Sequence, residues 1–237
     1  MTSVPEVSFV IPIYNEEAIL HAAVVDLRER LAPHALRYEI ILAENGSRDR
    51  TVEIARELCA RYPEVRLERS ATPNYGQALR LGISSARGEL VVCEEIDLCD
   101  VDFHLRALDL LRKGEADFVI GSKLIGGARD ARPWRRHAGS VLYTSVLRLL
   151  FDFRGTDTHG LKAFRRAAVL PLVDACRVER DVFASELTIR AYRAPLRVVE
   201  IPVRILEKRP PSIGLWRRLP GVAKDLWHLT WAVRLRP

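Results

Sequence analysis

The chain has 237 residues, of which 48% are hydrophobic and 29% charged, and its formal net charge is +6. This length and apolar content exclude a disordered or fibrous protein and suffice for one large domain with a packed core. No apolar run approaches the roughly 20 uncharged residues of a membrane-spanning helix, and residues 1–6 lack a secretion-signal pattern, so we expect a cytoplasmic protein.

The cysteines and the distribution of charge along the chain further narrow the class of protein. Four cysteines without CxxC or metal-finger spacing predict reduced thiols rather than a zinc ribbon or a disulfide scaffold. From Arg204 onward eight basic residues accompany two acidic ones, so this tail carries the whole net charge. A local basic segment beside apolar residues indicates an anionic surface or a phosphate, not a nucleic acid.

Apolar runs and helical patterns alternate along the first half of the chain. Five short runs are predicted to be strands, namely 7–13, 39–43, 65–68, 90–93 and 118–120, and all of them except 65–68 are mostly apolar. Helical spacing follows the first four, at 16–31, 51–59, 78–86 and 103–111, with Ser47 as the expected cap of the second helix. The alternation predicts an α/β fold whose mostly parallel central sheet is covered by helices on both faces.

The second half of the chain is less regular. A polar loop at 126–133 precedes helical spacing at 134–153, and the segment after Pro211 has apolar residues at spacings of three and four. We therefore divide the chain into a domain of residues 1–211 and a basic, amphipathic tail helix of residues 212–237.

An acidic segment, EEIDLCD, follows the fourth predicted strand. Ligands of parallel sheets bind at the carboxyl ends of the strands. Glu95 and Asp97 can therefore hold a divalent cation there, and such a cation stabilises a departing nucleotide diphosphate. On the spacing alone, a metal site and a structural role are equally favoured, the structural role being a solvated acidic loop or a helix start capped by Asp100.

Six segments occur in the order seen in family 2 glycosyltransferases. They are IPIYNEE at 11–17, ENGSRDRT at 44–51, the acidic segment, VIGSK at 119–123, HGLKAFRR at 159–166 and VVEIPVR at 198–204. More narrowly, they resemble the polyprenyl (dolichyl) phosphate sugar synthases over roughly residues 7–212, since weak motifs become specific together. The resemblance implies a GT-A fold of the nucleotide-diphospho-sugar transferase type and hexosyltransferase activity.

On the donor side, the resemblance implies that Pro12, Tyr14, Glu16 and Glu44 contact the nucleoside, and we add Ser47 from the same turn. Taken alone, both residue types favour a structural role, Tyr14 as an aromatic residue packed on the sheet at a strand end and Glu16 as an acid at a helix N-terminus.

For the metal, the resemblance matches Glu95 and Asp97 to the first and second acids of the family's DxD motif. They are the expected catalytic residues and ligands of Mg²⁺ or Mn²⁺. The family usually has Asp where Glu95 stands and often Gln where Cys99 stands, which leaves the metal's identity open and allows Cys99 to be core.

On the acceptor side, Lys123, Arg136 and Ser140 fall where those synthases hold a lipid phosphate, with surface positions as the alternative. A phosphate monoester is already an anion and attacks without a general base. For a hydroxyl acceptor a base is required, and Asp157 and Glu186 are the candidates, with a structural role equally open for both.

We therefore expect an inverting transfer of a hexose from a UDP- or GDP-linked donor to a polyprenyl phosphate at the cytoplasmic membrane face. A glycan or soluble hydroxyl acceptor is one alternative, and an inactive nucleotide-sugar-binding homologue that acts as partner or regulator is another. Trp216, Trp227 and Trp231 among the basic residues of the tail indicate a peripheral membrane helix or, equally, a helix packed on the domain or on a second subunit.

Overall fold

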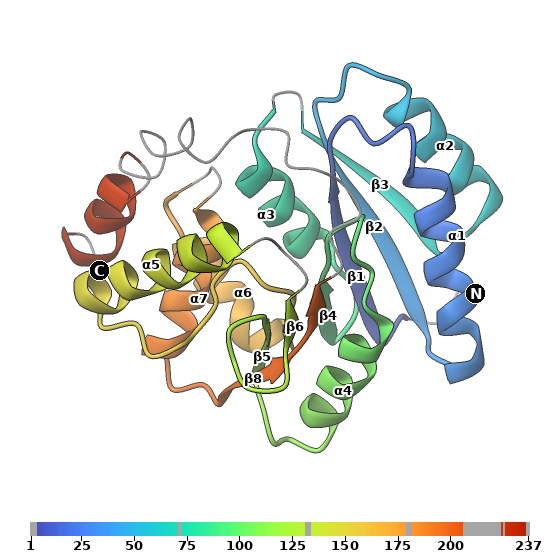
Figure 1. The fold of residues 1–237 in the computed structure, drawn as a ribbon. Helices are drawn as coiled ribbons and strands as arrows, with labels where there is room; N and C mark the ends of the chain where they lie inside the picture. The colour runs from blue at the N-terminus through green and yellow to red at the C-terminus, as the bar shows by residue number, and fades with distance from the viewer. Residues whose placement is uncertain are drawn as a thin grey trace.

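A seven-stranded sheet forms the centre of the molecule (Figure 1). The computed structural model describes residues 4–70, 73–130, 134–178, 182–205, 224 and 226–235. The strands are β1 (Val7–Ile13), β2 (Tyr38–Asn45), β3 (Val65–Ser70), β4 (Leu90–Cys93), β5 (Phe118–Ser122), β7 (Lys162–Arg165) and β8 (Val198–Pro202). Their order is β3-β2-β1-β4-β7-β5-β8, and only β7 is antiparallel to its neighbours, β4 and β5. The predicted mostly parallel sheet is confirmed.

Ahead of the C-terminal helical segment, the described residues form seven α-helices. They are α1 (Leu20–Leu31), α2 (Thr51–Arg61), α3 (Tyr75–Ser85), α4 (Val101–Arg112), α5 (Trp134–Phe151), α6 (Arg166–Ala175) and α7 (Phe183–Arg193) among the described residues. A short 3-10 helix, η1 (Ala32–His34), follows α1. The first helix begins at Leu20 rather than at the predicted Glu16, because the backbone N–H groups of residues 15–17 bond to the turn at 47–51 instead.

Alternate strand residues enter two separate cores, as the period of a strand requires. Phe9 and Ile11 of β1 pack with α1, α2 and α4 on one face of the sheet, where fully buried Phe103 also lies. Val10, between them, points to the other face and packs with α3, α6 and α7. Both faces of the sheet are therefore covered, as the continuous apolar runs predicted.

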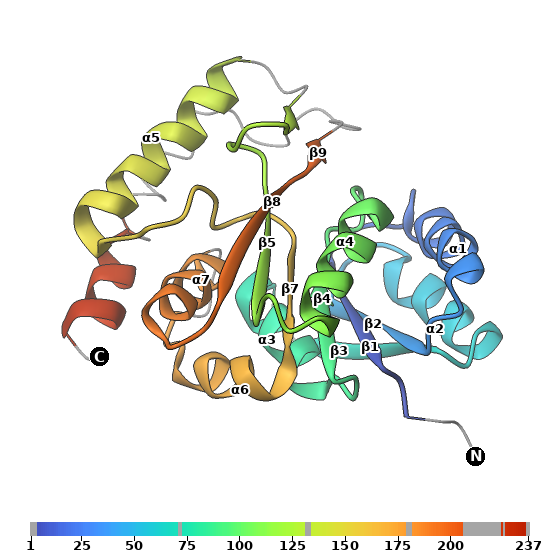
Figure 2. The same cartoon turned by 90° about the horizontal axis from the view of Figure 1, so that it is seen from below.

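A third core lies at the edge of the molecule, where α5 and the C-terminal helical segment are side by side (Figure 2). Residues 226–230 are helical and continue into the π-helix η2 (Trp231–Leu235). Leu229 and Val233 pack against Leu147 of α5, whereas Trp227 is 71% exposed. The described part of the tail thus packs on the domain and leaves tryptophan at the surface.

Several expectations fall outside the described residues. The domain boundary predicted at residue 211 and the predicted role of Trp216 are among them.

Two short strands, β6 (Arg129–Asp130) and β9 (Arg204–Ile205), pair in a separate small sheet. Within the described parts of the chain, no helix combines the length and the apolar character that crossing a membrane requires.

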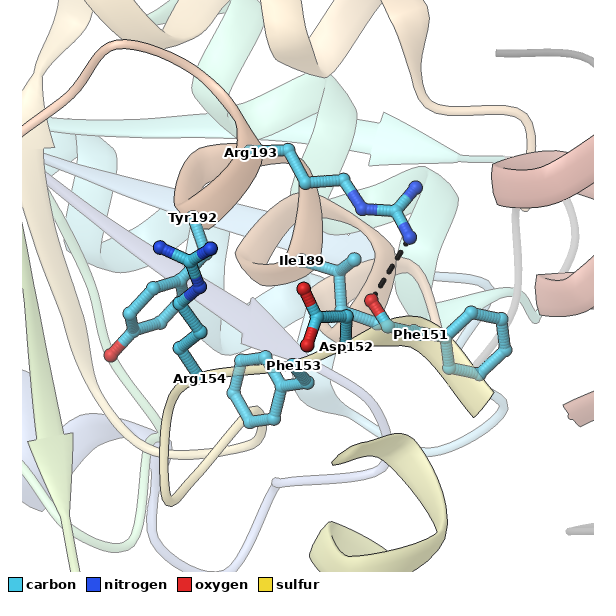
Figure 3. Close-up of a pocket in the computed structure, with 7 residues that line it drawn as sticks. All are labelled: Phe151, Asp152, Phe153, Arg154, Ile189, Tyr192 and Arg193. Carbon is cyan, nitrogen blue, oxygen red and sulfur yellow. Dashed lines mark hydrogen bonds between the residues drawn. The ribbon is translucent and has the colours of Figure 1, made fainter. Parts of the chain in front are cut away.

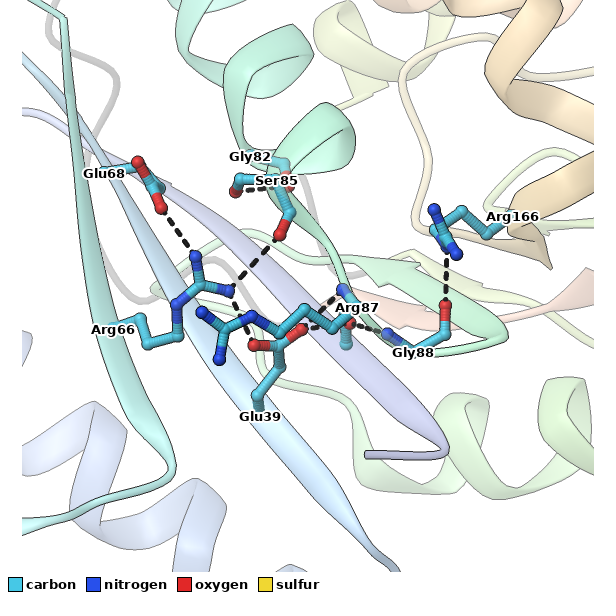
Figure 4. A network of polar contacts seen from close by, with 9 residues as sticks. Glu39, Arg66, Glu68, Gly82, Ser85, Arg87, Gly88 and Arg166 are labelled. Carbon is cyan, nitrogen blue, oxygen red and sulfur yellow. Dashed lines mark hydrogen bonds and ion pairs between the residues drawn. The ribbon is translucent and has the colours of Figure 1, made fainter. Parts of the chain in front are cut away.

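A buried polar network joins the amino ends of the central strands (Figure 4). Glu39 at the start of β2 accepts hydrogen bonds from Ser8 Oγ, from the backbone N–H of Arg87 and from Arg66 Nη1, each at 2.7 Å. Ser8 Oγ in turn accepts from Gly88 N–H at 2.9 Å. A Cβ on Gly88 would lie 2.7 Å from the backbone N of Ser8, so glycine allows this approach. The network ties β1, β2 and β3 to the loop before β4.

Candidate active site

Two turns at the carboxyl ends of β1 and β2 are tied together by reciprocal hydrogen bonds. The backbone N–H of Asn15 donates to Ser47 Oγ at 3.0 Å, and that of Glu16 donates to Thr51 Oγ1 at 2.7 Å. In the other direction, Arg48 N–H donates to Asn15 Oδ1 at 2.9 Å. Asn15 has a φ of 53°, a left-handed conformation that asparagine adopts more readily than most residues. The IPIYNEE and ENGSRDRT segments therefore form one structural unit.

The five residues expected to bind the nucleoside all lie in this unit. Pro12 is half-buried in β1, and Tyr14 just after the strand is 41% exposed. Glu44 is fully buried at the end of β2, where it accepts from Ser47 N–H and pairs with Arg69 Nε at 3.3 Å. Glu16 is half-buried and Ser47 is partly exposed in the two turns.

Ser47 does not cap α2, and that prediction is wrong. The helix begins four residues later, at Thr51. Asp49 Oδ1 accepts from the backbone N–H of Thr51 at 3.0 Å, while the Ser47 hydroxyl bonds to Asn15 across the two turns. Sequence spacing missed this because the partner of Ser47 is 32 positions away.

The acidic segment leaves β4 at the same edge of the sheet. Glu95 is exposed and Asp97 is partly exposed, whereas Asp100 caps α4 by accepting from Phe103 N–H at 3.2 Å. The surrounding protein raises the pKa of Glu95 although its side chain reaches solvent, and the Asp97 carboxylate raises it further. The ammonium groups of Lys123 and Lys162 act in the opposite direction and favour the ionised form of Glu95.

Beneath this turn, Glu94 and His104 form a fully buried pair. Glu94 Oε2 is in hydrogen-bonding contact with His104 Nε2 of α4. Burial raises the pKa of Glu94 and lowers that of His104 to about 3. The first acid of EEIDLCD is therefore structural, and it anchors the turn that carries Glu95 to α4.

Glu95 and Asp97 fit a hard divalent cation. Within the described ranges, no group of three or more His, Cys, Asp or Glu residues is arranged to hold a metal ion. Two carboxylates nevertheless match Mg²⁺ or Mn²⁺, which commonly take their remaining ligands from substrate phosphates and water. Cys99 is buried in the core, so the residues present provide oxygen ligands and no soft thiolate.

Lys123 and Asp157 form an ion pair with the Lys123 Nζ atom 2.7 Å from Asp157 Oδ2. Both side chains are largely buried, and Asp157 Oδ1 also accepts from His159 N–H at 2.9 Å. Burial alone would raise the pKa of Asp157, but the Lys123 ammonium and this hydrogen bond hold it below its usual value. The Asp157 carboxylate therefore serves to hold the Lys123 ammonium rather than to act as a general base.

The sequence analysis missed Lys162, the first residue of β7. It is 3% exposed, it is paired in register with Cys93 of β4 and Ile120 of β5, and its Nζ donates to Gly160 O at 2.7 Å. Because β7 is antiparallel, its first residue lies at the carboxyl edge of the parallel strands. Burial lowers the pKa of Lys162, and Asp157 and Glu95 partly offset this. A lysine inside the apolar run LKAF was the available signal.

Helix α5 turns one face toward the loop that carries Asp157. Thr144 Oγ1 donates to Thr156 O at 3.0 Å, and the rings of Tyr143 and His159 lie 5.4 Å apart. Ser140 is one helical turn before Thr144 and therefore lies along the same side. Arg136 is in the same helix, but its side chain is outside the described residues.

Glu186 lies apart from these groups, in α7. Its carboxylate is fully buried and accepts from the backbone N–H groups of Arg177 and Val178, at 2.9 and 2.8 Å, and from Arg190 Nε at 2.9 Å. These contacts are those of a structural carboxylate that holds the segment after α6.

A hollow of about 290 Å³ lies elsewhere, between the end of α5 and α7 (Figure 3). It is lined by Phe151, Asp152, Phe153, Arg154, Ile189, Tyr192 and Arg193. None of these residues belongs to the expected site, and the hollow is open to solvent beside exposed arginines. The polar cluster at the sheet edge, not this hollow, carries groups suited to catalysis.

The fold and the edge cluster together define a GT-A protein of the nucleotide-diphospho-sugar transferase type. The likeness extends to solved structures: glucosyl-3-phosphoglycerate synthase from Mycobacterium tuberculosis, in complex with UDP, superposes with a TM-score of 0.68 at 19% identity, over 98% of this chain and 81% of that one. The chain belongs to glycosyl transferase family 2, whose model matches residues 8–170.

Several curated relatives are similar over most of this chain. Glycosyltransferase AglD of Haloferax volcanii is 33% identical over 98% of this chain and 38% of its own length. An undecaprenyl-phosphate 4-deoxy-4-formamido-L-arabinose transferase of Pseudomonas aeruginosa is 32% identical over 75% and 51%, respectively. A dolichyl-phosphate beta-glucosyltransferase of Trichomonas vaginalis is 30% identical over 83% and 62%. The chain thus spans less than two thirds of each of these relatives.

Proposed function

We propose that the protein transfers a hexose, with inversion, from a UDP- or GDP-linked donor to a polyprenyl phosphate at the cytoplasmic membrane face. The observation that carries this proposal is the placement of five charged residues at one edge of the sheet: Glu95 and Asp97 follow β4, Lys123 follows β5 and is paired with Asp157, and Lys162 begins β7. Two of the three relatives described above are named for acting on undecaprenyl or dolichyl phosphate, which supports the choice of acceptor.

In the proposed reaction, each group at the edge has a separate task. A divalent cation, when bound to Glu95 and Asp97, would neutralise the charge that develops on the nucleotide diphosphate. The joined turns after β1 and β2 would hold the nucleoside. Lys123, with Ser140 and Arg136 of α5, would bind the acceptor phosphate through charge-assisted hydrogen bonds.

The acceptor phosphate oxygen would attack the anomeric carbon from the side opposite the leaving diphosphate. A new carbon–oxygen bond forms as the sugar–diphosphate bond breaks, which inverts the anomeric configuration. No proton must leave the attacking oxygen, because a phosphate monoester is ionised at neutral pH. This agrees with an Asp157 that is engaged by Lys123 and with a Glu186 whose oxygens hold backbone groups.

The test is turnover by the purified chain with radiolabelled UDP- and GDP-hexoses, Mn²⁺ or Mg²⁺, and a polyprenyl phosphate. We expect labelled sugar in the lipid fraction only when acceptor and metal are both present. Labelled glycan or a labelled soluble acceptor without lipid product would favour hydroxyl transfer instead. Nucleotide-sugar binding without any product would favour an inactive homologue.

We also propose that the tail side of the molecule contacts the membrane surface. Trp227 and Trp231 of the tail and Leu142 and Leu149 of α5 are exposed apolar side chains on neighbouring elements. Tryptophan is favoured at the membrane interface. Trp227→Ser with Trp231→Ser should reduce co-sedimentation with anionic vesicles, and unchanged sedimentation would exclude this contact.

A further inference from the structure

The VVEIPVR segment has no role in the reaction as proposed so far, yet its glutamate accepts three hydrogen bonds from two residues. Glu200 lies in β8, beside Ile120 of β5. Its Oε1 accepts from Thr156 N–H at 2.7 Å and from the Tyr192 hydroxyl at 2.9 Å, and its Oε2 accepts from the Thr156 hydroxyl. A single carboxylate therefore fixes both the backbone and the side chain of Thr156.

The hydrogen bonds continue from Thr156 to the end of β5. Thr156 Oγ1 and Ser122 Oγ are 2.6 Å apart, and Ser122 Oγ accepts from Leu124 N–H at 3.1 Å. An ionised Glu200 only accepts, so the Thr156 hydroxyl must donate to it and must accept from the Ser122 hydroxyl. The direction of the whole chain of hydrogen bonds is thus set by the charge on Glu200.

This chain of hydrogen bonds joins the two loops that carry the ion pair. Lys123 follows Ser122 directly, and Asp157 follows Thr156 directly. Each member of the 2.7 Å ion pair is therefore one residue away from the Ser122–Thr156 contact. The position of the Lys123 ammonium depends on how these loops are held.

Helix α5 and a glycine complete the arrangement. Arg148 donates to Gly155 O through Nε and Nη2, at 3.2 and 3.0 Å. A Cβ on Gly155 would lie 2.7 Å from Glu200 Oε1 and 2.8 Å from Tyr192 Cε2, so this position has room for glycine alone. The loop is held from the β8 side and from the α5 side.

We propose that Glu200 and Thr156 are positioning residues that set the Lys123–Asp157 pair for the acceptor phosphate. The identity of the ligand rests on the proposed function, whereas the coupling of Thr156 to the ion pair does not. Neither Glu200 nor Thr156 needs to touch the substrate.

The first experiment measures binding of two probes, geranyl phosphate and UDP with Mn²⁺. Thr156→Val removes the hydroxyl and keeps the shape of the side chain. We expect it to weaken geranyl phosphate binding by about tenfold, since misplacing a binding group by a fraction of an ångström is costly. UDP–Mn²⁺ affinity should stay within about twofold, because its expected binding groups lie in other loops. Glu200→Gln, which preserves size but removes the charge, should act in the same direction.

Thr188→Val is the matched control. Thr188 is fully buried, and its hydroxyl donates at 2.8 Å to Ala184 O within α7 itself. It should leave the affinity for both probes unchanged. Two outcomes would contradict the positioning role and indicate a general structural effect. One is an equal loss of affinity for both probes in Thr156→Val. The other is a loss of geranyl phosphate affinity in Thr188→Val as large as that in Thr156→Val.

The second experiment needs no ligand. Urea midpoints are measured for Thr156→Val, Lys123→Met and the double variant. Coupled residues give non-additive effects, so the double shift should be smaller than the sum of the single shifts. The pair Thr188→Val with Lys123→Met should be additive. Additive shifts for Thr156→Val and Lys123→Met would overturn the positioning role of Thr156. Non-additive shifts in a wild-type protein that does not bind geranyl phosphate would support the positioning role and would contradict a polyprenyl phosphate as the acceptor.

Discussion

Charged side chains lie at both ends of the central sheet, but the two ends differ in how these charges are paired. At the amino ends, both oxygens of Glu39 are bonded, and its partner Arg66 also pairs with Glu68 at 2.8 Å. At the carboxyl ends, Glu95 and Asp97 repel each other, and no carboxylate lies within ion-pairing distance of Lys162 in the described parts of the chain.

This difference separates charges that hold the fold from charges that await a ligand. A buried ion is tolerable when its partners compensate its desolvation, as they do for Glu39. Uncompensated charge at the other end reduces stability and is retained where it serves binding or catalysis. Substitutions at the two ends should therefore affect different properties of the protein.

The largest effect is expected at the carboxyl end. Asp97→Ala removes one of the two oxygen ligands and should lower the rate of sugar transfer by about 10²–10³-fold, the usual cost of losing one group that stabilises developing charge. The melting temperature should change little. Asp102→Ala, an exposed carboxylate of α4, is the control and should retain full activity. Near-normal turnover by Asp97→Ala would contradict the metal assignment.

At the amino end, Glu39→Ala should mainly destabilise the fold. It leaves Ser8 and the Arg87 N–H without their acceptor and Arg66 with only Glu68 and the Ser85 carbonyl, which should cost about 3 kcal/mol in the free energy of unfolding. Urea unfolding measures this loss, and activity per folded molecule should be unchanged. Glu68→Ala, at the outer side of the network, should cost less than about 1 kcal/mol.

Asp157 should give a smaller effect that depends on pH. Its pKa is lowered in the folded state, so its contribution is present above the ordinary carboxyl pKa and is lost as the pH falls through the folded value. Asp157→Asn should therefore cost on the order of 1–2 kcal/mol at pH 7 and progressively less below about pH 4. Urea unfolding of the wild type and of Asp157→Asn, at pH 7 and below about pH 4, measures the difference in unfolding free energy. A difference that does not change with pH would contradict the ion pair.

The smallest effect is expected for Arg69, the partner of Glu44. Its side chain is half exposed, so Arg69→Ala should lower the free energy of unfolding by less than about 1 kcal/mol. Glu44 also keeps its bond from Ser47 N–H. Thermal unfolding of Arg69→Ala, measured with and without UDP, tests this small loss of stability. A loss of unfolding free energy as large as that of Glu39→Ala would contradict the distinction between the two ends of the sheet.

Much of the fold followed from local patterns. The runs at 7–13 and 90–93 are the observed β1 and β4, and the helices that follow were located within a few residues. The reversed strand β7 was not predicted, because four residues with a lysine at their start show neither a strand's period nor its direction. Its neighbours are set by packing of segments far apart in sequence.

The site was predictable only where a motif is contiguous. Glu95 and Asp97 were found from their spacing after a strand, and the structure places them at the expected edge. Glu94 was not separated from them, because its partner His104 lies in the next helix. Thr156 and Glu200 are 44 positions apart, and no local pattern reports such a contact.

The insertion of β7 between β4 and β5 has a consequence for synthesis on the ribosome. Strands β1 to β4 can pair as soon as they emerge, but one edge of β4 stays without its neighbour until residue 165 has been made. An open strand edge invites pairing with other chains. Until β7 is made, the nascent protein therefore contains a partial sheet with an unpaired edge at β4.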